Sequence, residues 1–272
     1  MTQSNRYQDQ YFQTAVFDVD GTLLNSRHEV LSSTKNAIAK LLEQGVFVMV
    51  ATGKTFESTR ELRKELGITS LGVYTQGLFV CDDDGVPSKE IFLDNAIIRD
   101  VLDLVETHQI DLIAYAGSKL LTTKVNAATD RISVYHEPRP LLTQDLTAEP
   151  VNKFLLLAAQ PILDDIRARL ENSWSDRAKL LSSAVPGMLE IVPLNTSKGG
   201  TVARVLEGMG RPAETTVAFG DGENDIELLQ WAGLGVAMEN ASQKVQAAAD
   251  IVTLSNNEGG LAHMLNQLKF SR

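Results

Sequence analysis

AVFDVDGTLL, residues 15–24, joins an apolar run to two closely spaced acids and a glycine. A buried strand is predicted over Thr14–Phe17, because this run is short, uncharged and rich in β-branched and aromatic residues. Asp18 and Asp20 follow at the strand's end, where open α/β sheets bind ligands, and Gly21 permits a tight turn away from the sheet. Two acids here are costly unless a cation lies beside them. The stretch therefore predicts a site for a metal ion and a phosphate.

The composition is that of a globular protein and restricts the possible partners. The chain has 272 residues, 43% hydrophobic and 22% charged, with 25 basic and 35 acidic side chains and a net charge of −10. Nucleic-acid binding needs a positively charged surface, and this chain has an excess of negative charge, so we expect no nucleic-acid partner. Cys81 is the single cysteine, which excludes an intrachain disulfide and fits a reducing compartment. With no secretory signal or membrane span evident, we expect a cytoplasmic location and no membrane partner.

Alternating strands and helices after residue 13 predict a parallel sheet. Strands are expected at 14–17, 46–50 and 72–74, and helices at 30–44 and 55–66. The order strand-helix-strand-helix-strand implies parallel strands with right-handed crossovers. A hairpin is expected next, around the turn Asp82–Gly85. We assign its aspartates a conformational role, because they lack the alternating ligand spacing of a calcium loop.

A separate α/β region is predicted to interrupt this pattern. Its expected helices lie at 95–108 and 161–170, and its strands near 112–115, 119–122, 154–159, 179–183 and 189–192. The first pattern then resumes with helices at 197–209, 226–231, 241–249 and 259–268 and strands at 215–219, 235–237 and 251–252. The resulting domain prediction is a discontinuous core, residues 13–86 and 188–272, with an inserted domain at 87–187.

Polar residues gather where three of these strands end. The clusters are Asp18 with Asp20, Thr52 with Gly53, and Asp221 with Asn224 and Asp225, while Lys198 lies at the start of a predicted helix. In a parallel sheet the carboxyl ends of all strands lie along one edge. Residues about two hundred positions apart are therefore expected to converge on one pocket.

The residue types in this set suit phosphoryl transfer. The carboxylate of Asp18 can attack phosphorus and form an aspartyl-phosphate. Asp18, Asp221 and the backbone carbonyl of Asp20 can hold Mg²⁺, which prefers oxygen ligands. That arrangement leaves the Asp20 side chain to act as general acid and then as general base on water. Lys198 would supply positive charge to the phosphoryl group and to Asp18.

The remaining members of the set can bind phosphate or the metal's surroundings. The Thr52 hydroxyl and the Gly53 N–H can bind phosphate oxygens near a helix N-terminus, although a helix cap with a turn glycine also explains them. Asn224 can donate to phosphate, and Asp225 can accept from metal-bound water or orient Lys198. A capping or turn role for each acid is possible singly, but the ordered set favours phosphoryl transfer.

This ordered set resembles the motifs of the haloacid dehalogenase (HAD) superfamily. The matching segments are Phe17–Leu23, Thr52-Gly53, Lys198 within Leu189–Gly199, and Gly220–Asp225. The insertion between the second and third motifs resembles the C2-type cap of the Cof-like (IIB) phosphatases. The resemblance implies a Rossmann-like parallel-sheet core with an inserted α/β cap. It also implies that this cap is mobile or semi-mobile, lies over the pocket and selects the substrate.

The resemblance also implies an activity and its residues. It implies a Mg²⁺-dependent phosphatase with Asp18 as nucleophile and Asp20 as general acid and base. The metal is expected to be bound by Asp18, Asp20 and Asp221, and Asp225 is expected to contact these ligands or metal-bound water. Val19 joins Thr52, Gly53, Lys198 and Asn224 as the expected phosphate-binding residues. Two positions depart from the family pattern: Lys54 stands where Arg is usual, and Gln76 where Asn is usual.

The leading functional hypothesis is hydrolysis of a small phosphorylated metabolite by a monomer or homodimer. Sugar phosphates, flavin- or nucleotide-like phosphates and pyridoxal phosphate are the expected substrate classes. A phosphosugar mutase would use the same residues, and a non-catalytic phosphate-binding regulator is a third hypothesis. Within the insertion, a surface or packing role is expected for the polar residues that could face substrate, namely Tyr115, Lys119, His136, Arg139 and Lys153.

Overall fold

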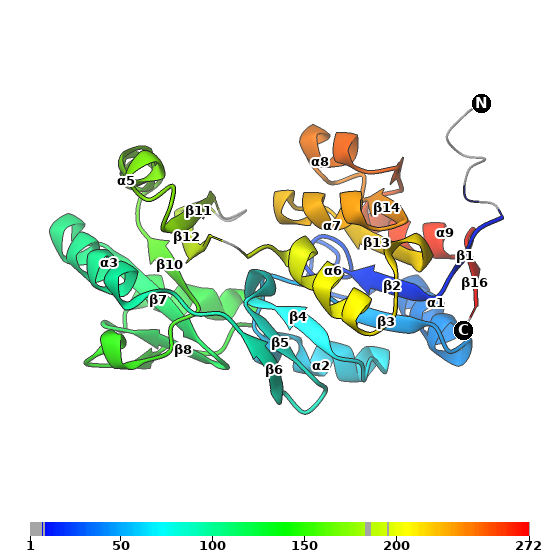
Figure 1. The fold of residues 1–272 in the computed structure, drawn as a ribbon, viewed down its shortest axis with the longest axis horizontal. Coiled ribbons are helices and arrows are strands. Elements are labelled where there is room, and N and C mark those ends of the chain that lie inside the picture. The colour runs from blue at the N-terminus through cyan, green and yellow to red at the C-terminus, as the bar shows by residue number, and fades with distance from the viewer. Residues whose placement is uncertain (1–6, 8, 183–185, 195, 272) are drawn as a thin grey trace. The chain divides into compact units, whose positions relative to one another are not determined.

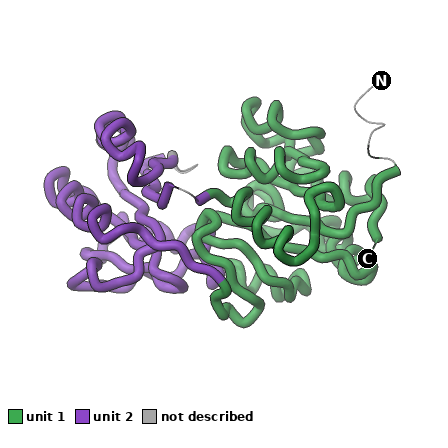
Figure 2. The backbone as a smooth tube through the Cα atoms, in the orientation of Figure 1, with its two compact units in different colours: residues 1–53, 59–88, 197–272 green, residues 54–58, 89–196 purple. Residues whose placement is uncertain are grey.

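The computed structural model describes residue 7 and residues 9–182, 186–194 and 196–271 (Figure 1). The chain forms two compact units (Figure 2): unit 1 comprises residues 1–53, 59–88 and 197–272, and unit 2 comprises residues 54–58 and 89–196. The boundary falls after residue 196 rather than at 187–188, because strand β12 (Met188–Pro193) pairs with strands of unit 2. A short segment, 54–58, also makes its contacts in unit 2.

A five-stranded parallel sheet forms the centre of unit 1. Its order is β15-β14-β13-β2-β3, and each neighbouring pair is parallel. The strands are β2 (Thr14–Phe17), β3 (Phe47–Val50), β13 (Thr216–Gly220), β14 (Leu234–Ala237) and β15 (Ile251–Val252). The predicted parallel sheet is therefore confirmed. β2 is fully buried between β13 and β3, which explains its uncharged sequence.

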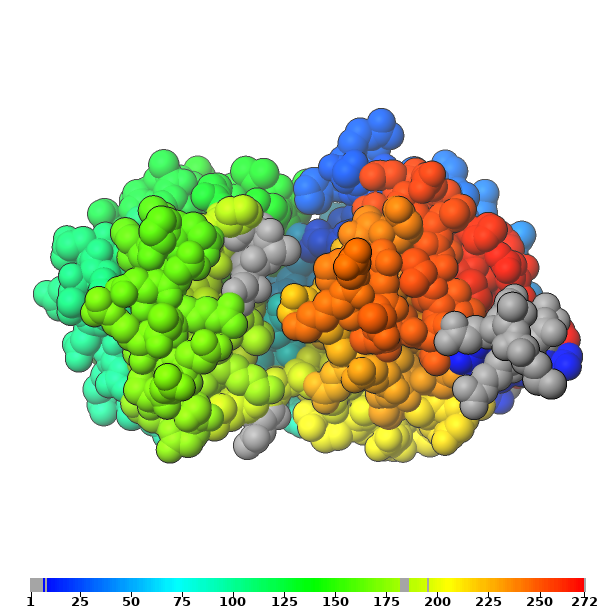
Figure 3. Space-filling view, turned by 90° about the horizontal axis from the view of Figure 1, so that it is seen from above, coloured from blue at the N-terminus to red at the C-terminus, as the bar shows by residue number. Residues whose placement is uncertain are grey.

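Helices cover both faces of this sheet. They are α1 (Ser32–Glu43), α2 (Phe56–Leu66), α6 (Lys198–Gly208), α7 (Ile226–Trp231), α8 (Gln243–Ala248) and α9 (Gly260–Leu265). Side chains alternate along β2, so that Ala15 and Phe17 pack with α1 and α9, whereas Val16 packs with α6 and α7. The orange and red segments after β13 form much of unit 1's surface in Figure 3.

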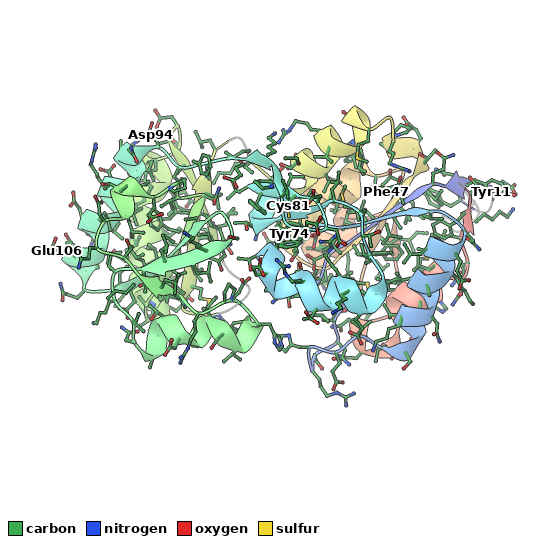
Figure 4. All side chains as sticks on the ribbon, turned by 90° about the horizontal axis from the view of Figure 1, so that it is seen from below. Tyr11, Phe47, Tyr74, Cys81, Asp94 and Glu106 are labelled. Atoms are coloured by element: carbon green, nitrogen blue, oxygen red, sulfur yellow. The ribbon has the colours of Figure 1, made fainter. Side chains whose placement is uncertain are left out.

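A small second sheet extends the first. It contains β4 (Gly72–Tyr74), β5 (Phe79–Cys81) and β6 (Pro87–Glu90). A parallel bridge between Ala51 and Val73 joins β4 to the end of β3. Tyr74 and Cys81 come from neighbouring strands and are buried in unit 1 (Figure 4). The Asp82 carboxylate accepts hydrogen bonds from backbone N–H groups two and four residues later, so the aspartate turn has the predicted conformational role.

The first and last strands of unit 1 lie side by side, which the sequence did not indicate. β1 (Tyr11–Phe12) pairs in parallel with β16 (Lys269–Phe270). The Phe12 ring is fully buried, with its centroid 6.2 Å from that of Phe270. Two-residue strands carry no detectable periodicity, so the sequence pattern does not reveal this pairing.

Unit 2 contains a six-stranded sheet covered on one face by two helices. The sheet order is β11-β12-β10-β7-β8-β9. The strands are β7 (Asp111–Ala116), β8 (Lys119–Thr122), β9 (Leu141–Leu142), β10 (Lys153–Leu157), β11 (Ala178–Ser182) and β12. The helices α3 (Asn95–His108) and α5 (Gln160–Ser173) pack through Val101 and Ile166 against Phe154 and Leu156 of β10. The predicted α/β insertion is confirmed as such.

Some elements of unit 2 differ from those predicted. A short helix α4 (Ala127–Asp130), with a further turn over Arg131–Tyr135, occupies a segment for which no element was predicted. The expected strand 179–183 is β11, and residue 183 lies outside the described residues. In the part of the chain that the structure describes, no helix is long and apolar enough to cross a membrane.

Candidate active site

Asp18 and Asp221 lie at the same edge of the parallel sheet. Asp18 directly follows β2, and Asp221 directly follows β13. The two strands pair in register up to Phe17 and Phe219, and the backbone N–H of Asp18 donates to the Phe219 carbonyl over 3.0 Å. The parallel register thus brings together two residues that are far apart in sequence.

Lys198 connects two of the predicted carboxylates. It is the first residue of α6, whose N-terminus is capped by Ser197, and its side chain is fully buried. Its Nζ lies 2.6 Å from Asp18 Oδ1 and also forms an ion pair with Asp225 Oδ1. Burial alone would lower the pKa of Lys198, but the Asp18 and Asp225 carboxylates outweigh it, and the pKa rises above its usual value. Lys198 is therefore a permanent cation between two acids.

Asp225 also fixes the loop that carries Asp221. It is fully buried, and its Oδ2 accepts hydrogen bonds from the backbone N–H groups of Asp221 over 3.1 Å and Gly222 over 2.9 Å. Asp225 therefore has two structural tasks, because one carboxylate oxygen holds the loop and the other contacts Lys198. The predicted role in orienting Lys198 fits these contacts.

Three carboxylates form a group whose chemistry fits Mg²⁺. One oxygen from each of Asp18, Asp221 and Asp225 lies within 4.8 Å of the others. Burial raises the pKa of Asp18 well above its usual value against the opposing effect of Lys198, and the other two carboxylates raise it further. Burial also raises the pKa of Asp221 to about 6. One ammonium does not balance three acids, so this oxygen-rich group suits a divalent cation.

Asp20 has a different environment from the three clustered acids. Its side chain is 46% exposed, and His28 Nδ1 lies 3.9 Å from its Oδ1. Val19 lies between the two acids with its side chain buried in the hydrophobic core, and its carbonyl accepts from the Leu24 N–H over 2.9 Å. Any contact of Val19 with phosphate must therefore use its backbone N–H.

Only glycine fits at position 21, because the Asp221 side chain lies directly beside it. The φ of Gly21, +79°, lies in the left-handed region that favours glycine. A Cβ atom at this position would lie 2.1 Å from Asp221 Oδ2. The next residue, Thr22, donates from Oγ1 to Asp221 Oδ1 over 2.9 Å. The turn after β2 thus approaches the Asp221 carboxylate closely and holds it.

Gln76 connects the Thr52 and Gly53 cluster with the cluster that contains Asn224. Its Oε1 accepts a hydrogen bond from Asn224 Nδ2 over 2.9 Å, and its backbone N–H donates to the Thr52 carbonyl over 3.2 Å. A Cβ atom on Gly53 would lie 2.7 Å from Gln76 Nε2. Gln76 stands where the family pattern has Asn. The structure gives it contacts with the predicted phosphate-binding residues.

Within unit 2, a carboxylate binds Thr55, the residue before α2. Glu137 accepts hydrogen bonds from the Thr55 backbone N–H over 3.1 Å and from Thr55 Oγ1 over 2.6 Å. The neighbouring Lys54 is buried, and its Nζ donates to the Tyr135 carbonyl over 2.5 Å. Burial raises the pKa of Glu137, against the hydrogen bonds from Thr55 and the charge of Lys54. Nothing in the sequence pattern indicated Glu137, because its partners are 82 residues away.

The polar residues considered in the insertion divide into two groups. Tyr115 and Lys153 are buried, with Lys153 Nζ 4.3 Å from the Tyr115 ring centroid and 3.2 Å from Glu190 Oε2. These two side chains therefore have a packing role. The exposed group comprises Lys119, His136 and Arg139.

A match over most of the sequence shows which family the chain belongs to. Residues 15–265 match the family model of the haloacid dehalogenase-like hydrolases. The chain belongs to this family. Among its relatives, phosphatase YwpJ of Bacillus subtilis is 29% identical over 92% of this chain and 98% of that protein. The B. subtilis 5-amino-6-(5-phospho-D-ribitylamino)uracil phosphatase YcsE is 29% identical over 90% of this chain and 91% of its own length.

A longer relative shares the same region. The chloroplastic endoribonuclease YBEY of Arabidopsis thaliana is 34% identical over 93% of this chain, which spans only 46% of that protein. The ribonuclease name therefore describes a protein of about twice the length of this hydrolase.

Solved structures share the fold of this hydrolase. A haloacid dehalogenase-like hydrolase from Bacteroides thetaiotaomicron has a TM-score of 0.86 at 26% identity and covers 94% of this chain and 99% of its own. A Thermotoga maritima protein has a TM-score of 0.85 at 29% identity, with 95% and 98% covered. The hydrolase thus has the expected HAD-like α/β fold and is a phosphatase of the Cof type, a phosphoric monoester hydrolase.

The raised pKa of Asp221 predicts how the metal-free protein responds to pH. Its pKa rises from 3.8 to about 6 on folding, so the folded state binds the proton more tightly than the unfolded state. The resulting stabilisation is present below pH 3.8 and is lost as the pH rises through about 6. We expect urea denaturation in EDTA to show a fall in the free energy of unfolding over this window. Asp221→Asn should reduce that fall, and equal pH slopes for variant and wild type would contradict the assignment.

Proposed function

We propose that this hydrolase is a Mg²⁺-dependent phosphatase that acts on small phosphomonoesters through an aspartyl-phosphate on Asp18. The observation that carries the proposal is the buried group around Asp18, in which Lys198 contacts its carboxylate and Asp221 and Asp225 lie beside it. A nucleophilic carboxylate next to a fixed cation and a candidate metal site is the arrangement that phosphoryl transfer needs.

Each protein group has a proposed role in this reaction. An Asp18 oxygen forms a bond to phosphorus while the bond to the leaving oxygen breaks, and the Asp20 carboxyl group gives that oxygen a proton. Water then attacks the aspartyl-phosphate, Asp20 takes the water's proton, and the Asp18 carboxylate is released. Lys198 neutralises charge throughout. Mg²⁺, bound by Asp18, Asp221 and the Asp20 carbonyl, would supply further positive charge to the phosphoryl oxygens.

Contacts to the phosphate are assigned to four further groups. The backbone N–H groups of Val19 and Gly53, the Thr52 hydroxyl and the Asn224 amide are proposed to donate to its oxygens. Asn224 and Gly53 both lie against Gln76, which supports a common position for them. A monomeric or homodimeric state and a cytoplasmic location belong to the same proposal, the latter because one buried cysteine fits a reducing compartment.

A substrate panel tests the proposed activity. The panel contains sugar phosphates, flavin mononucleotide, nucleotides, pyridoxal phosphate and 5-amino-6-(5-phospho-D-ribitylamino)uracil, the compound named in one relative. With Mg²⁺ present we expect at least one of these esters to be hydrolysed with kcat/KM of about 10⁴ M⁻¹s⁻¹ or more. EDTA should abolish the reaction. If none of these esters releases phosphate, the proposal is wrong.

Asp20→Asn should separate catalysis from metal binding. The exposed Asp20 side chain lies outside the cluster of Asp18, Asp221 and Asp225. The variant should therefore lose proton transfer but keep its backbone carbonyl. We expect kcat to fall by about 10²- to 10⁴-fold, with Mg²⁺ affinity close to that of the wild type. Isothermal titration calorimetry measures that affinity. Asp221→Asn is the comparison, and equal losses of Mg²⁺ affinity in both variants would rule out this division of roles.

A further inference from the structure

Asn240 lies outside the predicted motifs, yet its side chain contacts the candidate metal site. We propose that Asn240 is a positioning residue, which holds the Asp221 carboxylate and the turn after β2 in the arrangement that binds Mg²⁺. The inference rests on the proposed function, because it requires the metal site assigned there.

The Asn240 amide bridges three segments of unit 1. Its Nδ2 donates to the Gly21 carbonyl over 3.0 Å and to Asp221 Oδ2 over 3.3 Å. Its Oδ1 accepts from the Asn256 backbone N–H over 2.9 Å. Two acceptors face one end of the amide and a donor faces the other, so its orientation is fixed by chemistry. One exposed side chain thus joins the turns after β2 and β15 to the loop after β13.

These contacts fix the Asp221 carboxylate at both oxygens. Thr22 donates to Oδ1, and Asn240 donates to Oδ2. With a donor on each oxygen, the carboxylate cannot rotate without losing a hydrogen bond. Donors of this kind orient the residues that bind a metal, and removing one typically lowers metal affinity by about 10- to 100-fold.

The same network fixes the turn that carries the Asp20 carbonyl. Asn240 binds the carbonyl of Gly21, the next residue, and Asn256 Nδ2 donates to the Leu24 carbonyl over 2.9 Å. Asn256 in turn is the donor to Asn240 Oδ1. Removing the Asn240 amide would therefore release the Gly21 carbonyl and one oxygen of Asp221 together. The first effect acts on the turn that carries the Asp20 carbonyl, and the second acts on a carboxylate assigned to the metal.

A neighbouring asparagine provides a matched control. Asn257 Oδ1 accepts from the Ser26 backbone N–H over 3.0 Å and from Ser26 Oγ over 2.9 Å. Asn257 thus joins the segment after β2 to the segment after β15, as Asn240 does, and its hydrogen bonds lie in an exposed part of the structure. Neither of these hydrogen bonds reaches Asp221 or Gly21. Asn257→Ala therefore removes a comparable link without touching the metal-binding groups.

The experiment titrates Mg²⁺ into metal-free wild type, Asn240→Ala and Asn257→Ala by calorimetry, without substrate. We expect the dissociation constant to rise by about 10- to 100-fold in Asn240→Ala and to stay at the wild-type value in Asn257→Ala. With the best ester of the panel, kcat of Asn240→Ala should return to near the wild-type value at saturating Mg²⁺. A purely structural defect would lower kcat at every Mg²⁺ concentration.

The outcomes separate this inference from the proposed function. Equal Mg²⁺ affinity in Asn240→Ala and Asn257→Ala would overturn the role of Asn240 and leave the phosphatase proposal intact. A wild type that binds no Mg²⁺ would overturn the metal site itself and this inference with it. Asn240→Ser, whose shorter side chain cannot span both acceptors, repeats the test if the alanine variant does not fold, and the same rise in dissociation constant is expected.

Discussion

Asp18→Asn is expected to abolish phosphate release, with kcat lowered by at least about 10³-fold. An amide is a poor nucleophile, so no aspartyl-phosphate forms, although the side chain keeps its size. The fold should survive, because burial raises the pKa of Asp18 and so favours a neutral side chain at this position. A continuous phosphate assay at saturating substrate and a urea denaturation curve measure both effects.

The control for Asp18→Asn is the same change at an exposed site. Asp84 lies exposed in the turn between β5 and β6, and Asp84→Asn should leave kcat unchanged. Mass spectrometry of rapidly quenched wild type should detect a phosphoryl group on the peptide that contains Asp18. Retention of more than about a tenth of wild-type kcat by Asp18→Asn would show that another group attacks phosphorus.

Lys198→Met is expected to lower the free energy of unfolding by about 3–5 kcal/mol. The methionine fills similar volume but leaves the Asp18 and Asp225 carboxylates buried without their ammonium partner. Activity should disappear as well, because the fixed positive charge beside the nucleophile is lost. Urea denaturation of the metal-free protein measures the stability change.

The exposed pair between Lys244 and Glu223 provides the comparison. Its charged atoms are 2.7 Å apart, but the side chains are 66% and 65% exposed. Lys244→Met should therefore cost no more than about 1 kcal/mol. Combining Lys198→Met with Asp225→Asn should recover part of the lost stability, because one uncompensated charge disappears. Equal costs for Lys198→Met and Lys244→Met would contradict the central role of burial.

The parallel sheet could be predicted because its strands carry a strong local signal. Thr14–Phe17 and the segment at β13 are uninterrupted apolar runs, and buried parallel strands have this pattern. β1 and β16 gave no such signal, because their pairing depends on a contact between residues more than 250 positions apart. The short helix α4 was also missed, since a four-residue element has no periodicity to detect.

The residues of the candidate site also fall into those that the sequence predicts and those that it does not. Asp18, Asp221 and Lys198 could be placed together from the sequence, because the ends of parallel strands meet at one edge. Asn240 and Glu137 could not, because each acts through hydrogen bonds to residues that only the folded chain brings close. A lone asparagine or glutamate is common in any turn, so residue type alone does not single out either position.

The placement of residues 54–58 in unit 2 affects the design of chimaeras between members of this family. A graft of residues 89–196 alone would carry Glu137 into a host without bringing Thr55, which donates both hydrogen bonds to its carboxylate. A buried acid would then depend on whatever the host supplies in that segment. The exchangeable module is therefore discontinuous, and donor residues 54–58 should be transplanted together with the long insertion.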